Sequence, residues 1–319
     1  MPRTSPTARP RRLRAGLVGG LALALAAAGT LVGGPAATAA PSPKAKGVAE
    51  CPGIAVPASK ISIQMFSYNS WVRDVGIETV LGELEDIGYR NVEPFGGTYG
   101  GRSAEDWSAL LDSYGLKQPS SHGSTNEATF GTTLEFAKEV GQKYVGSGGF
   151  AAPGIARDGS SSYEDVIATA ETMNRLGELS VKNGTGKLFG HNHQWEFTTQ
   201  VTDPETGETK SAWEVLVENT DKRWVTFQLD VLWAEDAGYS AADLLERYGK
   251  RIELLHIKDG LLNGEDRAIP TDVGEGEIDW APILTAARGH VKYYVVERDG
   301  APASAEFAED SFEFLTCSS

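Results

Sequence analysis

Eight short apolar runs separated by helix-like segments dominate the sequence from residue 61 onward. The runs span residues 61–65, 91–93, 116–121, 143–146, 187–193, 225–230, 252–256 and 293–297. Stretches such as 74–87 and 162–183 lie between them, and apolar residues recur there at helical spacing. Strands that alternate with helices favour a parallel sheet. Eight such pairs predict one α/β domain with the (β/α)8 fold, the TIM barrel.

An open, doubly wound sheet is the alternative arrangement of such units. That fold usually carries a glycine-rich phosphate-binding turn after its first strand. Residues 66–69, which follow the first strand here, contain no glycine, so the barrel is favoured. Residues 198–210 break the alternation, because turn-forming residues 203–207 separate two Thr- and Val-containing arms. This pattern predicts a small hairpin insertion after the fifth strand.

Residue types that bind metals stand where most of these strands end. They are Glu93 after strand two, His122 after strand three, His191 and His193 at strand five, Asp230 at strand six, His256 with Lys258 at strand seven, and Glu297 at strand eight. Solvent-facing polar residues are the ordinary explanation of any one of them. Four of the chain's five histidines are in this set, however, and the carboxyl ends of barrel strands form the active-site face. The set therefore predicts one shared site.

Three of these residues come from successive strands and predict a centre for one divalent metal ion. Asp230, His256 and Glu297 would meet around the ion, with an imidazole from strand five as a further ligand. His191 and His193 share a strand face because they are two residues apart; His193 lies nearer the rim and is the preferred ligand, which leaves His191 for catalysis. Imidazole and carboxylate ligands suit Mn²⁺ first, with Zn²⁺, Co²⁺ or Fe²⁺ possible and Mg²⁺ less favoured.

The remaining polar and aromatic residues at the strand ends are candidates for contact with substrate. Lys258 would carry a proton or donate to a substrate oxygen, although a salt bridge with Asp259 or Asp299 is an equally good interpretation. The candidate substrate-binding residues are Glu93, His122, Trp195 and Trp233. The alternatives are a surface carboxylate for Glu93, a structural histidine for His122, and aromatic packing for the two tryptophans.

The N-terminus has the three parts of a secretory signal peptide. Five arginines precede an apolar run at residues 15–31, and a small-x-small site follows at 37–39. We expect residues 1–39 to be removed on export by the Sec or Tat route, leaving a linker at 40–59 and a barrel at 60–319; an uncleaved membrane anchor is the alternative. Removal takes away five arginines and no acidic residue, so the formal net charge falls from −15 to −20.

So acidic a protein is a poor partner for nucleic acid or an anionic membrane, because both bind clustered Lys and Arg. The expected partner is a small, neutral sugar or keto-sugar, and the oligomeric state stays open. The only two cysteines, Cys51 and Cys317, lie near the two ends of the mature chain. Since the predicted compartment is oxidising, the pair is expected to form a disulfide, with two free thiols as the alternative.

Five stretches of the chain resemble a known family. They are 190–197 (GHNHQWEF), 229–233 (LDVLW), 254–259 (LLHIKD), 273–279 (VGEGEID) and 294–299 (YVVERD). Their order and spacing resemble the xylose-isomerase-like barrel superfamily, in its sugar phosphate isomerase/epimerase branch, over residues 60–315. The resemblance implies a (β/α)8 barrel with a divalent metal at strands five to eight, and Asp230, His256 and Glu297 occupy the ligand positions. The family's strand-five glutamate is replaced here by the histidine pair.

These observations together predict a secreted, metal-dependent sugar isomerase or epimerase. The metal would chelate a carbonyl and a neighbouring hydroxyl and stabilise an enediolate after proton abstraction. Glu297 would act as ligand and base, with His191 or Lys258 as its proton-transfer partner. A lyase that acts on 3-keto-glycosides by β-elimination is the first alternative, and a non-catalytic sugar-binding barrel is the second. Export and the negative charge argue against a nuclease.

Overall fold

Parallel strands form the centre of the protein in the computed structural model, which describes residues 51–97, 99–263 and 267–318. The predicted signal peptide and most of the predicted linker lie outside these residues. The strands are β1 (Ile61–Gln64), β2 (Asn91–Glu93), β3 (Tyr144–Gly146), β4 (Lys187–His191), β7 (Val225–Asp230), β8 (Ile252–Ile257) and β11 (Tyr293–Val296). They pair in parallel in the order β2-β1-β11-β8-β7-β4-β3, as a barrel requires.

The predicted third strand, residues 116–121, is not a regular strand. It still fills the position between β2 and β3, because its backbone bonds to both neighbours. These bonds run from Lys117 N to Arg90 O (3.0 Å), His122 N to Pro94 O (2.9 Å), Lys143 N to Pro119 O (2.8 Å) and Gly123 N to Gly146 O (2.9 Å). Pro119 has no N–H to donate to a ladder, which accounts for the irregular pairing. The segment closes the ring of strands.

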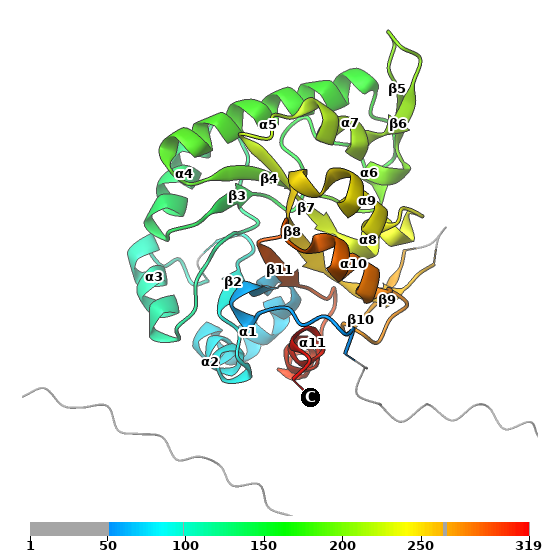
Figure 1. Ribbon diagram of the computed structural model, residues 1–319. Coiled ribbons are helices and arrows are strands. Elements are labelled where there is room, and N and C mark those ends of the chain that lie inside the picture. Colours follow the sequence, from blue (N-terminus) through cyan, green and yellow to red (C-terminus); the bar gives the residue numbers. More distant parts are fainter. Residues whose placement is uncertain (1–50, 98, 264–266, 319) are drawn as a thin grey trace, which may run out of the picture. The chain divides into compact units, whose positions relative to one another are not determined.

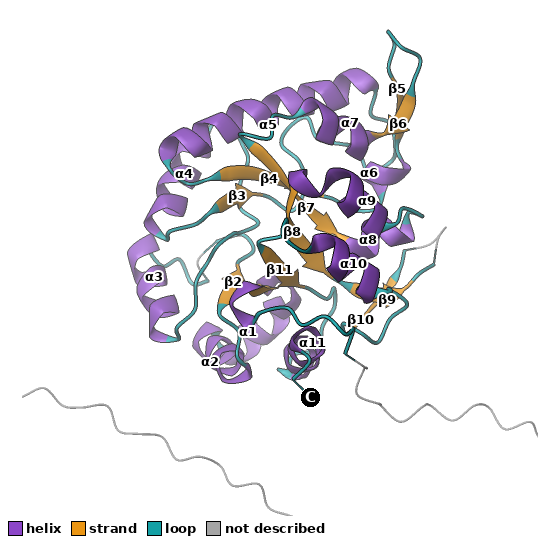
Figure 2. Ribbon diagram, viewed as in Figure 1, coloured by secondary structure: helices purple, strands orange, loops and turns teal. Residues whose placement is uncertain are grey.

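Helices surround the strands, as Figures 1 and 2 show. They are α1 (Asn69–Val75), α2 (Ile77–Ile87), α3 (Ala104–Ser113), α4 (Phe130–Glu139), α5 (Tyr163–Asn183), α7 (Ala212–Asn219), α9 (Ala241–Tyr248), α10 (Trp280–Ala287) and α11 (Glu306–Thr316). The helix predicted at 74–87 is divided at Gly76, whose φ of 86° suits glycine and no L side chain. Ser162 and Asp165 form a capping box that begins α5.

Several loops at the strand ends have structure of their own. The predicted hairpin is β5 (Gln200–Thr202) paired with β6 (Thr209–Ser211), and Figure 1 shows it projecting beyond α6 (Trp195–Thr198) and α7. A second hairpin, β9 (Asp259–Leu261) with β10 (Ile269–Thr271), lies between β8 and α10. Short helices, α6 and α8 (Val231–Asp236), follow β4 and β7, so residues just beyond these strands are held over the barrel.

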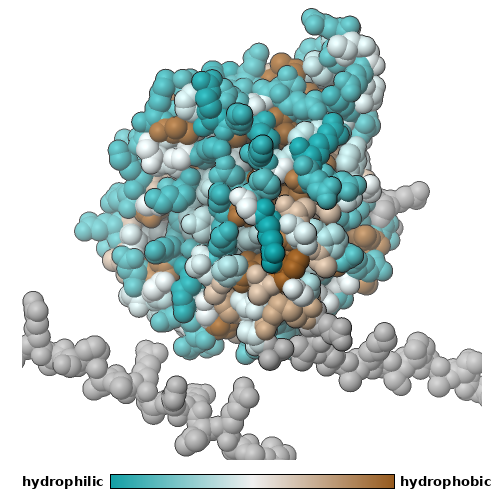
Figure 3. All heavy atoms as spheres, viewed as in Figure 1, coloured by the Kyte–Doolittle hydropathy of each residue, from teal (hydrophilic) through white to brown (hydrophobic). Residues whose placement is uncertain are grey.

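The two ends of the described chain lie together. Cys51 and Cys317 form a disulfide with their Cα atoms 5.1 Å apart, and Val56 N donates to Leu315 O (2.8 Å) nearby. Hydrophilic residues cover most of the face seen in Figure 3. No helix among the described residues is long and apolar enough to cross a membrane.

Candidate active site

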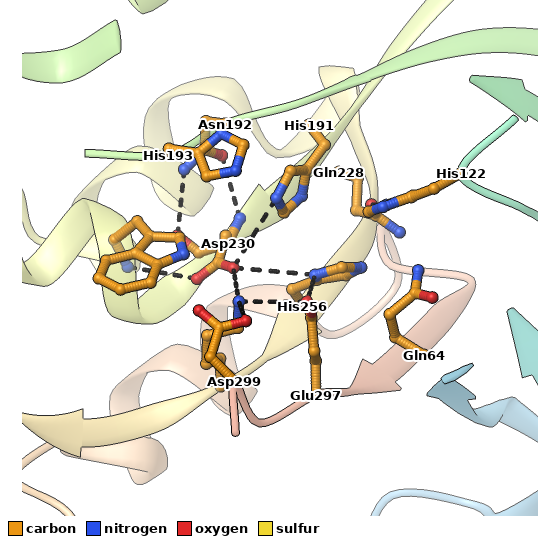
Figure 4. A network of polar contacts seen from close by, with 12 residues as sticks. Gln64, His122, His191, Asn192, His193, Gln228, Asp230, His256, Glu297 and Asp299 are labelled. Carbon is orange, nitrogen blue, oxygen red and sulfur yellow. Dashed lines mark hydrogen bonds and ion pairs between the residues drawn. The ribbon is translucent and has the colours of Figure 1, made fainter. Parts of the chain in front are cut away.

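Three side chains from neighbouring strands converge at the carboxyl end of the barrel. Asp230 ends β7, His256 lies opposite it in β8, and Glu297 directly follows β11. All three are buried. The His256 Nδ1 atom lies 2.6 Å from Glu297 Oε2 and 3.7 Å from Asp230 Oδ2, and Figure 4 shows the three groups turned toward one another. The predicted meeting of these residues is therefore present.

These three atoms have the arrangement expected of metal ligands. Asp230 Oδ2, His256 Nδ1 and Glu297 Oε2 are buried, and their close contacts with one another and with Lys258 lack hydrogen-bond geometry, although buried polar atoms are normally hydrogen-bonded. One ligand atom from each residue lies within 4.8 Å of the others. The second oxygen of Asp230, Oδ1, accepts from Trp233 N (3.2 Å) and caps α8. Mixed imidazole and carboxylate donors fit a divalent transition metal.

Lys258 brings a buried positive charge to the same point. Its Nζ atom lies 3.2 Å from Asp230 Oδ2 and 3.2 Å from Glu297 Oε2, and Asp299 Oδ1 is 3.7 Å away. Burial opposes its charge, but these carboxylates raise the pKa of Lys258 above its ordinary value. Of the two salt bridges considered for it, the one with Asp299 forms. Asp259 instead accepts from Gly274 N and Trp280 Nε1, each at 2.8 Å.

The two histidines at the end of β4 have different surroundings. His191 Nε2 lies 4.0 Å from Asp230 Oδ2, and its ring centre is 4.5 Å from that of His256. His193 instead stacks on Trp195 at 4.1 Å between ring centres, with its Nδ1 atom 4.0 Å from Glu196 Oε1. Burial lowers the pKa of His191 well below its usual value, so this imidazole is neutral. The geometry favours His191 as the nitrogen ligand, whereas the sequence analysis preferred His193.

Glu93 lies behind His256 and does not line the pocket, so its predicted substrate-binding role does not match its position. Its carboxylate is fully buried and faces His256 Nε2 at 3.0 Å. The carboxylate also accepts from Gln64 Nε2 (2.7 Å), Gln228 Nε2 (2.8 Å) and Ser120 Oγ. A carboxylate on the far nitrogen of a metal-binding histidine fixes the ring's orientation and tautomer. Glu93 therefore turns Nδ1 of His256 toward Asp230 and Glu297.

The other predicted contact residues line the cavities at the strand ends. His122 lines the pocket, with its Nε2 atom 2.8 Å from Gln228 Oε1. Trp195 is partly exposed, whereas Trp233 is buried and its ring lies 5.2 Å from Lys258 Nζ. Four further residues at the site were not predicted from the sequence: Gln64, Gln228, Arg157 and Arg267. A glutamine inside an apolar strand was the available signal for the first two; the arginines lie in loops without any pattern.

A cavity of about 300 Å³ opens over the converging side chains. Its lining residues include Phe66, Phe95, His122, His191, His193, Lys258, Glu297 and Asp299. Apolar walls with a few converging polar groups are typical of small-molecule sites. Burial lowers the pKa of His193 to about 4, so the pocket holds a neutral imidazole beside an ammonium group and carboxylates. Such a set can polarise a substrate oxygen and move a proton.

Comparison with known proteins gives three results. Residues 81–316 match the family described as xylose isomerase-like TIM barrel. An inosose dehydratase of Clostridium perfringens is 27% identical over 160 residues, which is 44% of this chain and 50% of that protein; the chain thus matches about half the length of this relative. A sugar phosphate isomerase/epimerase structure from Parabacteroides distasonis has a TM-score of 0.65 and 25% identity, covering 83% of this chain and 96% of that one.

A further structure similar in fold is the IOLI protein with a bound zinc atom. It has a TM-score of 0.56 and 19% identity, and the match covers 80% of this chain and 95% of that one.

Proposed function

The chain belongs to the xylose isomerase-like TIM barrel family, and from that premise we propose that it is a divalent-metal-dependent isomerase or epimerase of a sugar or keto-sugar. The observation that carries the proposal is the meeting of Asp230 Oδ2, His256 Nδ1 and Glu297 Oε2, three buried ligand-type atoms that lie within 4.8 Å of one another. We further propose that the enzyme acts outside the cell, on the strength of the signal-like residues 1–39.

Asp230, His256, Glu297 and the neighbouring His191 would hold the metal. When bound, a divalent cation supplies Lewis-acid polarisation of a carbonyl oxygen. The zinc in the IOLI structure supports this choice of cofactor class, and Mn²⁺ remains the ion we expect first.

The chain's own groups would then move the proton. Glu297 stays ionised, because the ammonium of Lys258 opposes the effect of burial and holds the pKa of Glu297 below its ordinary value, so it can accept a proton from the carbon beside the carbonyl. The ammonium of Lys258, 3.2 Å from Glu297 Oε2, can donate to the oxygen on which negative charge develops. Return of the proton to carbon gives an isomer or epimer.

A lyase is the second candidate, and two observations favour it. The relative from Clostridium perfringens is a dehydratase, and the end of β4 carries histidines where the family resemblance implies a second glutamate. An epimerase needs a second group that can deliver a proton to the opposite face of the reacting carbon. If the proton is not returned, a β-substituent can leave from the same enediolate, as in elimination from a 3-keto-glycoside. A barrel that binds sugar without catalysis is the remaining alternative.

Deuterium exchange separates these functions. Manganese-loaded protein would be incubated in D₂O with aldoses, ketoses, inososes and 3-keto-glycosides, and the products followed by NMR. We expect deuterium at a carbon next to the carbonyl, and its loss in the variant Glu297→Gln. A rearranged sugar identifies an isomerase, and a released β-substituent identifies a lyase.

The matched control is Glu253→Gln, because Glu253 contacts Lys187 and Tyr144 at the start of β8 and does not touch the pocket. This variant should exchange like the wild-type protein. A metal-loaded protein that exchanges no substrate across the panel would contradict the enzymatic proposal and leave binding as the function.

A further inference from the structure

A second cavity, of about 320 Å³, adjoins the one over the candidate metal centre. Both cavities are lined by Arg157, His193, Trp233 and Arg267. A ligand whose carbonyl lies at Asp230, His256 and Glu297 therefore has the second cavity beside it. The residues of the second cavity decide which substituent such a ligand can carry.

The lining of the second cavity is basic, although the protein is strongly acidic. Its described residues are Arg157, His193, Gln194, Trp195, Thr198, Trp233 and Arg267. Two of them are arginines and none is a carboxylate, in a chain whose formal net charge is −15. The two guanidinium groups are therefore the formal charges of this lining. The cavity thus offers positive charge without compensation within its own wall.

Each of these arginines lies over an indole ring. The guanidinium carbon of Arg157 is 4.6 Å from the centre of Trp195, and that of Arg267 is 4.6 Å from the centre of Trp233. Stacking on an aromatic face holds a planar guanidinium in place and leaves its N–H edges available. Within the described part of the chain, Arg157 makes no ion pair, whereas Arg267 Nη2 contacts Asp299 Oδ2 at 2.5 Å.

We propose that the substrate is an anionic sugar whose acidic group binds between Arg157 and Arg267 while its carbonyl lies at Asp230, His256 and Glu297. The proposal rests on the function proposed above and changes the expected substrate from a neutral sugar to a charged one. Guanidinium groups bind carboxylate and phosphate oxygens in pairs, so the acidic group is a carboxylate, as in a sugar acid, or a phosphate ester. Arg157 provides the free charge, and Asp299 orients Arg267.

Binding affinities of matched ligands test the proposal without relying on turnover. The probes are D-glucose, D-glucuronate and D-glucose 6-phosphate, titrated into the metal-loaded protein by calorimetry at low and high salt. We expect at least one acid to bind at least tenfold more tightly than glucose, and added salt to reduce that difference. The acid that gains more identifies carboxylate or phosphate as the recognised group.

Variants separate recognition by arginine from direct binding of the acid to the metal. Arg157→Gln should lower the affinity for the acid by a much larger factor than the affinity for glucose, so that most of the preference for the acid is lost. The matched control is Arg175→Gln, because Arg175 is an exposed residue of α5 that pairs with Glu127; it should keep the full preference.

Two results would overturn the inference. The first is that neither acid binds more tightly than glucose, or that neither binds measurably. The second is that the preference for the acid survives in the double variant Arg157→Gln/Arg267→Gln. Since the readout is binding, a protein that exchanges deuterium but shows no preference for acids would contradict this inference alone.

Discussion

At the scale of single residues, the two histidines near the end of β4 have different neighbours, which their spacing in the sequence does not reveal. His191 faces Asp230 and His256, and His193 faces Trp195. Alternation along a strand put both on one face, but β4 ends at His191. His193 already lies in the turn toward α6, where the carboxylate of Glu196 accepts from its backbone N–H at 2.7 Å.

This difference predicts unequal effects of removing each imidazole. His191→Ala should weaken Mn²⁺ binding by ~100-fold or more, beyond the roughly 10–100-fold cost of losing a partner of a ligand. His193→Ala should keep the metal affinity close to wild type and reduce turnover instead, because His193 lines both cavities. Titration of metal against a fluorescent chelator measures both variants. A larger loss of metal affinity in His193→Ala would show that the ligand assignment is reversed.

At the scale of elements, the carboxyl ends of β1, β2, β7 and β8 are joined by one buried polar network. Glu93 of β2 lies at its centre and contacts Gln64, Gln228 and His256. Fully satisfied networks of this kind rigidify a core, whereas an unpaired member is costly. The network holds the imidazole of His256 before any metal binds.

Replacing the central carboxylate should therefore loosen the metal centre from behind. We expect Glu93→Gln to lower the affinity for Mn²⁺ by about 10–100-fold, with the variant still folded as judged by its circular dichroism and melting curve. Glu253→Gln, at the other end of β8, is the control and should bind metal normally. Unchanged metal affinity in a folded Glu93→Gln variant would mean that Glu93 has only a packing role.

The same elements show which features local patterns can predict. Buried strands and their polar ends were visible in the sequence, because apolar runs and the residues after them are local signals. The hydrogen bond that joins Glu93 to Gln228, 135 residues away, depends on the curvature of the sheet and has no local signature. The sequence predicts a strand at residues 116–121, but Pro119 lacks the N–H that a strand donates to its neighbour, so the segment is irregular.

At the scale of the whole molecule, the fold determines which residues meet. The order of strands places β7, β8 and β11 side by side, so residues from three distant parts of the sequence share one point. This much follows from the barrel alone. The basic cavity does not, because Arg157 and Arg267 come from loops whose paths depend on how the chain packs over the strand ends.

The central claim is that one divalent cation binds where Asp230, His256, Glu297 and His191 meet. Anomalous diffraction from crystals grown with Mn²⁺ tests it directly. We predict a single strong peak within coordination distance of Asp230 Oδ2, His256 Nδ1 and Glu297 Oε2. A ring nitrogen of His191 should be the fourth ligand. A peak only elsewhere, for example among Asp272, Glu275 and Asp310, whose acidic groups also lie close together, or no peak at the strand ends, would contradict the account.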